Sequence, residues 1–244
     1  MAAITPGTLA DVAGDHAFAE LYEAKAQTYA AFGNGAVAEH AGRLLPAGGR
    51  MLDIGCASGG LHAMLRSHAG HLAGLEPSAS AAHAAAQVAD HVVQGALEDP
   101  ELPFEASSFD LVVLADVLEH LADPAAGLAR AVSWCRPGGG AILVSVPNVA
   151  HWQARLTLLR GRWPQEDSGT FDATHLRWFT RESLAGLLAG SGLRDAELRA
   201  IVPALRNHIG PARLADRLEP AWQALGRRVP GLLGYQVLGI GRRP

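Results

Sequence analysis

The stretch MLDIGCASGG, residues 51–60, decides the fold, because a short apolar run leads directly into a glycine-rich turn. In an open α/β sheet, such a turn after the first strand lets a ligand approach the backbone beyond the carboxyl ends of the strands. Glycine-rich turns also arise for steric reasons, and Gly55-x-Ala57-x-x-Gly60 fits a degenerate dinucleotide pattern as well. The stretch predicts a cofactor loop without choosing the cofactor.

Strand and helix patterns alternate around this loop. Apolar runs predict strands, and helical spacing predicts helices between them. The predicted strands are 50–54, 71–76, 91–94, 108–115 and 141–146, and the predicted helices begin near 59 and cover 78–89 and 124–135. Residues 15–45 predict further helices before the sheet. This alternation predicts an α/β, doubly wound, mostly parallel sheet.

The rhythm breaks after Pro147, where aromatic residues stand among Arg and Asp in residues 148–179. This composition is typical of a functional insertion, and we expect a substrate lid. A helix 180–191, a strand 193–201, a stretch 203–230 and a closing strand 235–242 follow. We expect one domain, with a helical cap 1–47, a cofactor-binding core 48–147, the lid 148–179 and a C-terminal part 180–244.

Composition excludes several classes of protein. The net charge is −4. Nineteen of the twenty basic residues are arginines and one is Lys25, but this bias runs through the whole chain and marks no nucleic-acid patch. Cys56 and Cys135 form no CxxC pair. Neither a signal peptide nor a membrane-spanning run of about eighteen apolar residues is visible, so we expect a cytoplasmic protein acting on a small molecule.

Two acids narrow the choice of cofactor. Glu76 ends the second predicted strand twenty-three residues after Asp53, near the offset at which an acid accepts ribose hydroxyls, although it could instead be a solvated helix cap. Asp53 lies at the start of the glycine turn, where a carboxylate repels a pyrophosphate and attracts a cation. The loop therefore favours a cationic cofactor over NAD.

Two further motifs, FDLVVLADVLEHL at residues 109–121 and RPGGG at 136–140, complete a pattern that resembles the class I S-adenosylmethionine-dependent methyltransferases. The resemblance covers about residues 48–200. It implies a Rossmann-like sheet of seven strands with an antiparallel last strand. It also implies S-adenosyl-L-methionine as the cofactor and methyl transfer as the reaction.

The resemblance carries the cofactor contacts onto particular positions. They are Asp53, Gly55, Cys56, Ala57 and Gly59 for the methionine part, Glu76 for the ribose, Ala96 and Leu97 near the adenine, and Ala115 at the end of the fourth strand. The chain departs from the family where Ala57 replaces a common glycine and Ala96 replaces a common acid. We therefore expect backbone contacts at these two positions.

Two histidines are candidate catalytic bases, because a hydroxyl acceptor must lose a proton during methyl transfer. His120 lies in the turn after the fourth strand, and His175 lies in the lid. The segment Asp172-x-Thr174-His175-Leu-Arg177 resembles a signature of bacterial methyltransferases of cell-surface polysaccharide and natural-product pathways. Either histidine could also be structural, and Arg177 could bind an acidic substrate group or Asp172.

We assign no metal ligand, but one alternative stays open. Asp116, Glu119 and His120 resemble the acid-x-x-Glu-His metal ligands of ubiquinone-pathway O-methyltransferases, and a divalent ion there would lower the pKa of an acceptor hydroxyl. We expect O-methylation of a sugar, glycan or secondary metabolite. The alternatives are N-methylation, a non-catalytic cofactor-binding module and an NAD-dependent oxidoreductase.

Residues 203–230 combine five arginines and two acids with interleaved apolar residues. A basic amphipathic helix of this kind can lie on a membrane or dock a partner. We favour the simpler interpretation, in which the helix covers the last two strands and exposes its arginines to solvent.

Overall fold

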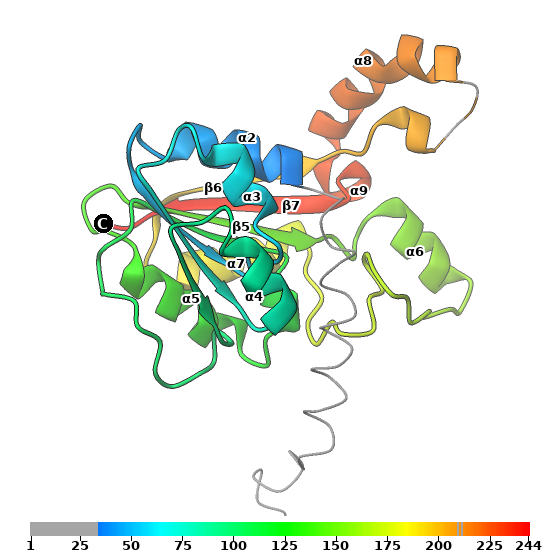
Figure 1. Cartoon of the computed structure of the whole chain (residues 1–244). Coiled ribbons are helices and arrows are strands. Elements are labelled where there is room, and N and C mark those ends of the chain that lie inside the picture. Colours follow the sequence, from blue (N-terminus) through cyan, green and yellow to red (C-terminus); the bar gives the residue numbers. More distant parts are fainter. Residues whose placement is uncertain (1–33, 209, 211) are drawn as a thin grey trace, which may run out of the picture.

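A seven-stranded sheet forms the centre of the computed structural model, which describes residues 34–208, 210 and 212–244 (Figure 1). The strands are β1 (Arg50–Ile54), β2 (His71–Glu76), β3 (His91–Gln94), β4 (Leu111–Ala115), β5 (Ala141–Pro147), β6 (Arg194–Ile201) and β7 (Gln236–Arg242). Their order in the sheet is β3-β2-β1-β4-β5-β7-β6, and only β7 runs antiparallel to its neighbours. The predicted doubly wound, mostly parallel sheet with an antiparallel last strand is confirmed.

Helices connect these strands, and three of those in the described residues begin at a side-chain cap. The helices are α2 (Asn34–Leu44), α3 (Gly60–Leu65), α4 (Ala79–Ala85), α5 (Pro124–Trp134), α6 (Trp152–Leu159), α7 (Arg181–Gly190), α8 (Ala212–Arg228) and α9 (Pro230–Leu233), with 3-10 turns η2 (Leu118–His120) and η3 (Leu205–Asn207). The side chains of Ser78, Asp123 and Thr180 accept backbone N–H bonds at the starts of α4, α5 and α7. Of the predicted helices in 15–45, residues 15–33 lie outside the described part.

Side chains alternate between the two faces of the sheet, as expected for strands. On β4, Leu111 and Val113 pack into the cluster that includes residues of α2 and α3. Val112 and Leu114 pack into the opposite cluster, with residues of α5 and α7. Both faces of the central strands are therefore buried, which explains the continuous apolar runs that mark them in the sequence.

Two predicted boundaries are wrong. The helix expected over 78–89 ends at Ala85, because the chain must turn to bring Asp90 against β2, where its carboxylate accepts a hydrogen bond from the Leu72 N–H at 2.7 Å. The strand expected over 108–115 begins at Leu111, and Phe109 makes only an isolated bridge with Cys135.

The C-terminal stretch also differs from the expectation that its helix covers the last two strands. α8 packs against η3 and α9 and projects beyond the sheet (Figure 1), while the short helix α9 contacts β6. The physical reason is that α8 buries only Ala215 and Gly226, which are too small to fill a core. Within the described ranges, no helix is both long enough and apolar enough to cross a membrane.

We expect Leu128→Ala on α5 to lower the free energy of unfolding by about 2–5 kcal/mol, because the leucine side chain is fully buried between helix and sheet and leaves a cavity. Leu159→Ala, in another helix and at a side chain that is 84% exposed, is the matched control and should change it by less than about 0.5 kcal/mol. Urea unfolding measures both. Equal losses in the two variants would contradict the described core.

Candidate active site

The turn between β1 and α3 has a backbone that requires glycine at two positions. Gly55 and Gly59 have φ angles of 70° and 83°. A Cβ on Gly55 would lie 2.7 Å from the Val117 side chain, and one on Gly59 would lie 2.5 Å from that of Val88. Ala57 adopts the same left-handed region, with a φ of 45°, without being glycine. The turn therefore stores strain at Ala57, and some other interaction must hold it.

Glu76, at the carboxyl end of β2, supplies that interaction. Its side chain is buried, and one carboxylate oxygen accepts a hydrogen bond from the Ala57 N–H at 2.8 Å while the other accepts one from the Ser78 N–H at 2.9 Å. The carboxylate thus fastens the glycine turn to the loop that follows β2. A carboxylate has about four acceptor sites on its two oxygens, so these two hydrogen bonds are compatible with the predicted role of Glu76 as a ribose acceptor.

Asp53 is buried on the face of β1 that packs against α3. Burial and, to a smaller extent, the negative charge of Glu76 together raise the pKa of its carboxyl to about 8. The nearest cationic candidate is His62, whose Nε2 lies 3.9 Å from the Asp53 carboxylate. Burial lowers the pKa of His62 to about 4, so this contact is not an ion pair at neutral pH. The two buried acids therefore favour a cationic ligand.

The turn after β3 is held by an acid that the sequence did not single out. The Asp99 carboxylate accepts a hydrogen bond from the Ala96 N–H, three residues earlier in the chain, at 2.8 Å, and this bond closes the turn. The Leu97 side chain is buried in the core, and its carbonyl accepts a hydrogen bond from Arg130. The backbone at Ala96 and Leu97 is therefore held in a fixed turn, as the predicted backbone contacts to the adenine would require.

Asp116, directly after Ala115 on β4, is held by the two neighbouring strands. Its carboxylate accepts a hydrogen bond from the Ser145 hydroxyl at 3.1 Å and two from the Gln236 amide at 2.9 and 2.8 Å. Burial raises the pKa of Asp116 to about 6, and these hydrogen bonds oppose the rise. Ser145 and Gln236 were missed in the sequence, because only the pairing of β5 with β4 and β7 brings them to Asp116.

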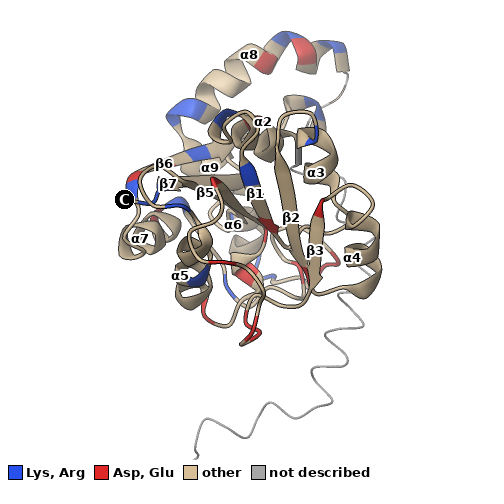
Figure 2. Ribbon diagram, turned by 60° about the vertical axis from the view of Figure 1, so that its left-hand side comes forward, with Lys and Arg blue, Asp and Glu red and all other residues tan. Residues whose placement is uncertain are grey.

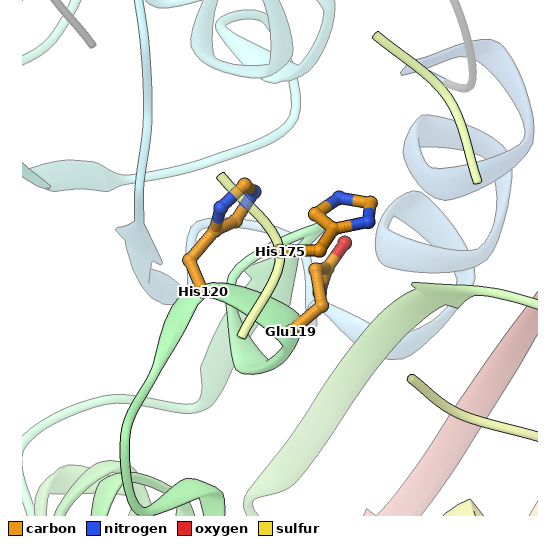
Figure 3. A group of neighbouring side chains, drawn as sticks. All are labelled: Glu119, His120 and His175. Carbon is orange, nitrogen blue, oxygen red and sulfur yellow. The ribbon is translucent and has the colours of Figure 1, made fainter. Parts of the chain in front are cut away.

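Glu119, His120 and His175 form a buried group at this edge of the sheet. Each offers one ligand atom, and these atoms lie within 4.8 Å of one another. Figure 3 shows Glu119 and His120 coming from η2, with the Glu119 carboxylate directed at the ring of His175. Among the described residues, neither carboxylate oxygen of Glu119 has a hydrogen-bond partner, and burial raises the pKa of this carboxyl well above the ordinary value. Asp116 is not part of this group.

Residues 148–179, the predicted lid, reach the group through backbone hydrogen bonds. The N–H groups of Leu176 and Arg177 donate to the Glu119 carbonyl at 2.8 and 2.9 Å. The Arg177 guanidinium donates to the Ala122 and Leu176 carbonyls. These contacts fix residues 175–177 against η2, which explains why His175 lies beside His120.

Both histidines present the same ring nitrogen to a backbone carbonyl. His120 Nδ1 lies 3.2 Å from the Thr174 carbonyl, His175 Nδ1 lies 3.4 Å from the Thr170 carbonyl, and the ring centroids are 4.9 Å apart. A carbonyl only accepts hydrogen bonds, so Nδ1 carries the proton in each neutral ring. Nε2 then carries the lone pair, as both a proton acceptor and a metal ligand require.

The cofactor loop and the histidine group are neighbours. β1 and β4 are adjacent parallel strands, with Ile54 paired to Leu114, so their carboxyl ends meet at one edge. The close approach of Gly55 to Val117 joins the loop to the residue before η2. The predicted loop residues and the two predicted histidines therefore lie on one edge of the sheet.

Comparison with known proteins agrees with this arrangement. A family model described as a methyltransferase domain matches residues 22–198. The ubiquinone biosynthesis O-methyltransferase of Ralstonia nicotianae is 28% identical over 169 residues, which are 64% of this chain and 67% of that relative.

Two solved structures share the fold. One is an S-adenosylmethionine-dependent methyltransferase of Thermotoga maritima, described as a possible histamine N-methyltransferase. It has a TM-score of 0.66 at 19% identity and covers 92% of this chain and 99% of its own. The other is the phosphoethanolamine N-methyltransferase 2 of Haemonchus contortus in complex with S-adenosyl-L-methionine, with a TM-score of 0.55, 19% identity and coverage of 86% and 52%.

We expect the free energy of unfolding of the ligand-free protein to fall as the pH rises from about 4 to about 8. The native state keeps the Asp53 proton up to about pH 8, whereas an unfolded aspartate loses it near 3.8, so the native state binds more protons in this window. Urea unfolding at several pH values checks this. Asp53→Asn should reduce the slope, with Asp116 and Glu119 contributing the remainder, and Glu76→Gln should reduce it less. An unchanged slope in Asp53→Asn would rule out Asp53 as the source.

Proposed function

This chain belongs to the methyltransferase-domain family and is an S-adenosylmethionine-dependent methyltransferase, and we propose that it methylates a hydroxyl group of a small molecule. The observation that carries the proposal is the pair of buried histidines, His120 and His175, beside the loop predicted to hold the cofactor. A hydroxyl acceptor must lose its proton as the new bond to carbon forms, and an imidazole whose Nε2 carries the lone pair can take it.

The residues of the loop have distinct tasks in this proposal. S-adenosyl-L-methionine supplies a methyl group on a positively charged sulfur, which is transferred by in-line displacement. A cationic methionine part bound near Asp53 would lower the raised pKa of this carboxyl, so that Asp53 would face the cation as a carboxylate. Glu76 accepts the ribose hydroxyls while it holds the turn at Ala57. The remaining requirement is alignment of the acceptor oxygen with the methyl group. We assign this task to residues 148–179, the predicted lid.

The name of the Ralstonia relative supports oxygen as the acceptor atom. Within hydroxyl acceptors, we propose a sugar, glycan or secondary metabolite, on the resemblance of the segment Asp172–Arg177 to a signature of bacterial methyltransferases. N-methylation of a small molecule is the competing reaction, and an amine acceptor would have less need of the histidine pair.

A divalent metal ion is a second way to activate the hydroxyl at the same place. Glu119, His120 and His175 would hold it, since carboxylate and imidazole ligands suit such ions. The observation that favours it is the buried Glu119 carboxylate, which has no hydrogen-bond partner in the described part of the chain and which a cation would neutralise. Bound there, the ion would lower the pKa of an acceptor hydroxyl.

We expect Glu76→Ala to weaken binding of S-adenosyl-L-methionine by about 100-fold, because the variant loses both the ribose acceptor and the two hydrogen bonds that hold the turn. Isothermal titration calorimetry measures the affinity. Glu101→Ala, at an exposed glutamate, should bind as the wild type does. Wild-type affinity in Glu76→Ala would remove Glu76 from the cofactor site.

The acceptor and the base are tested together by transfer of a labelled methyl group to a panel of sugars, other hydroxyl compounds and amines. On the best hydroxyl acceptor, His175→Ala should lower kcat by about 100-fold, with cofactor affinity retained, since a positioned base contributes about 100-fold or more. His120→Ala tests the other candidate, and His83→Ala, at an exposed histidine of α4, is the control.

Three outcomes would change the proposal. Transfer to amines alone would replace O-methylation by N-methylation. Wild-type kcat in both His175→Ala and His120→Ala would remove the histidines from the reaction. Loss of activity on chelation, with recovery on adding a divalent ion, would assign the group to a metal instead of a free base.

A further inference from the structure

Helix α8 is attached to the rest of the molecule along one narrow face. Gly226 lies so close to Val202 that a Cβ would come within 2.5 Å of the valine side chain. The indole N–H of Trp222 donates to the Pro203 carbonyl at 2.9 Å, and Ala215 is fully buried. Small residues and one indole therefore anchor the helix, and they leave its large apolar side chains on another face.

Those side chains form what we call the leucine stripe. Its members are Leu214, Leu218 and Leu225 of α8, continued by Val229 and by Leu232 of α9. The three leucines of α8 are 47%, 44% and 48% exposed. Positions four and seven residues apart share one face of a helix with about 3.6 residues per turn. A helix that covers a core turns such a stripe inward, whereas this stripe faces outward.

Arginines border the leucine stripe on one side. Arg213, Arg217 and Arg228 are spaced by four and eleven residues, so they share a helix face next to the stripe. Figure 2 shows basic residues at both ends of α8. We call these three residues the arginine row.

The two acids of α8 face the body of the protein. Asp216 forms an ion pair with Arg206 at 3.2 Å. Glu219 accepts hydrogen bonds from the Leu205 N–H and from the Gln223 amide, both at 2.7 Å. The acids are therefore used in attaching the helix, and the surface that carries the leucine stripe is positively charged.

We propose that the leucine stripe and the arginine row dock the protein on an anionic lipid bilayer. An amphipathic helix with leucines on one face and arginines beside them lies in the interface, with its apolar side chains among the acyl chains and its guanidinium groups at the headgroups. Each basic residue near an anionic surface adds attraction. A second copy of the chain would bring a second arginine row to the contact, which like-charge repulsion opposes. This inference does not depend on the identity of the methyl acceptor.

The experiment is flotation of the full chain with vesicles of phosphatidylcholine alone or of equal parts phosphatidylcholine and phosphatidylglycerol. The wild type should float with the mixed vesicles, remain behind with neutral ones and bind less at high salt. Leu214→Ser/Leu218→Ser/Leu225→Ser should bind about 100-fold more weakly. Arg217→Gln/Arg228→Gln should bind about 25-fold more weakly, at about fivefold per arginine.

The controls carry the same substitutions elsewhere. Met64→Ser replaces an apolar side chain of α3 that is 46% exposed, and Arg181→Gln replaces an exposed arginine at the start of α7. Both should bind as the wild type does. All substituted side chains are exposed, and unchanged urea midpoints would confirm intact folding.

Two results would overturn the proposal. The first is a wild type that fails to float with anionic vesicles, or that floats equally with neutral ones. The second is a wild-type dimer in light scattering that the triple serine variant converts to a monomer without any vesicle binding, which would assign the leucine stripe to a second copy of the chain.

Discussion

The bonds from one carboxylate to two backbone N–H groups hold the site together. Glu76 closes the glycine turn through Ala57 and the following loop through Ser78. Without them, the left-handed conformation at Ala57 would relax, because it costs free energy that must be offset by an interaction elsewhere. With them, Gly55 stays against Val117, and the turn after β1 keeps its place beside the turn after β4.

The same edge of the sheet collects buried acids, and such groups predict a cationic ligand there. Asp53, Asp116 and Glu119 all have raised pKa values, and burial is the largest cause in each case. A fold keeps such groups against their desolvation cost mainly where they serve a ligand. In the proposed site, the positive charge of S-adenosyl-L-methionine would offset that cost near Asp53. Glu119 lies further along the edge, where a protonated base or a metal ion would have the same effect.

The central fold could be read from the sequence, because its determinants are local. Apolar runs mark the buried parallel strands, and the glycines of residues 51–60 follow from φ angles and close contacts at those positions. The placement of α8 could not be read this way. Its pattern of leucines and arginines fits a helix on a core equally well. Contacts with distant residues decide which face is attached, among them Gly226 against Val202 and the Trp222 indole on the Pro203 carbonyl.

The sequence by itself determined the strands and the residue types at their ends. From these it predicted a cofactor loop at residues 51–60, an acid for the ribose at Glu76, and two histidines as candidate bases. Only the tertiary structure decided that His120 and His175, fifty-five residues apart, face one another. The physical reason is that the Glu119 carbonyl accepts hydrogen bonds from Leu176 and Arg177, a contact between distant segments that no local pattern encodes. The same contact joins Glu119 to the histidines and leaves Asp116 to Ser145 and Gln236.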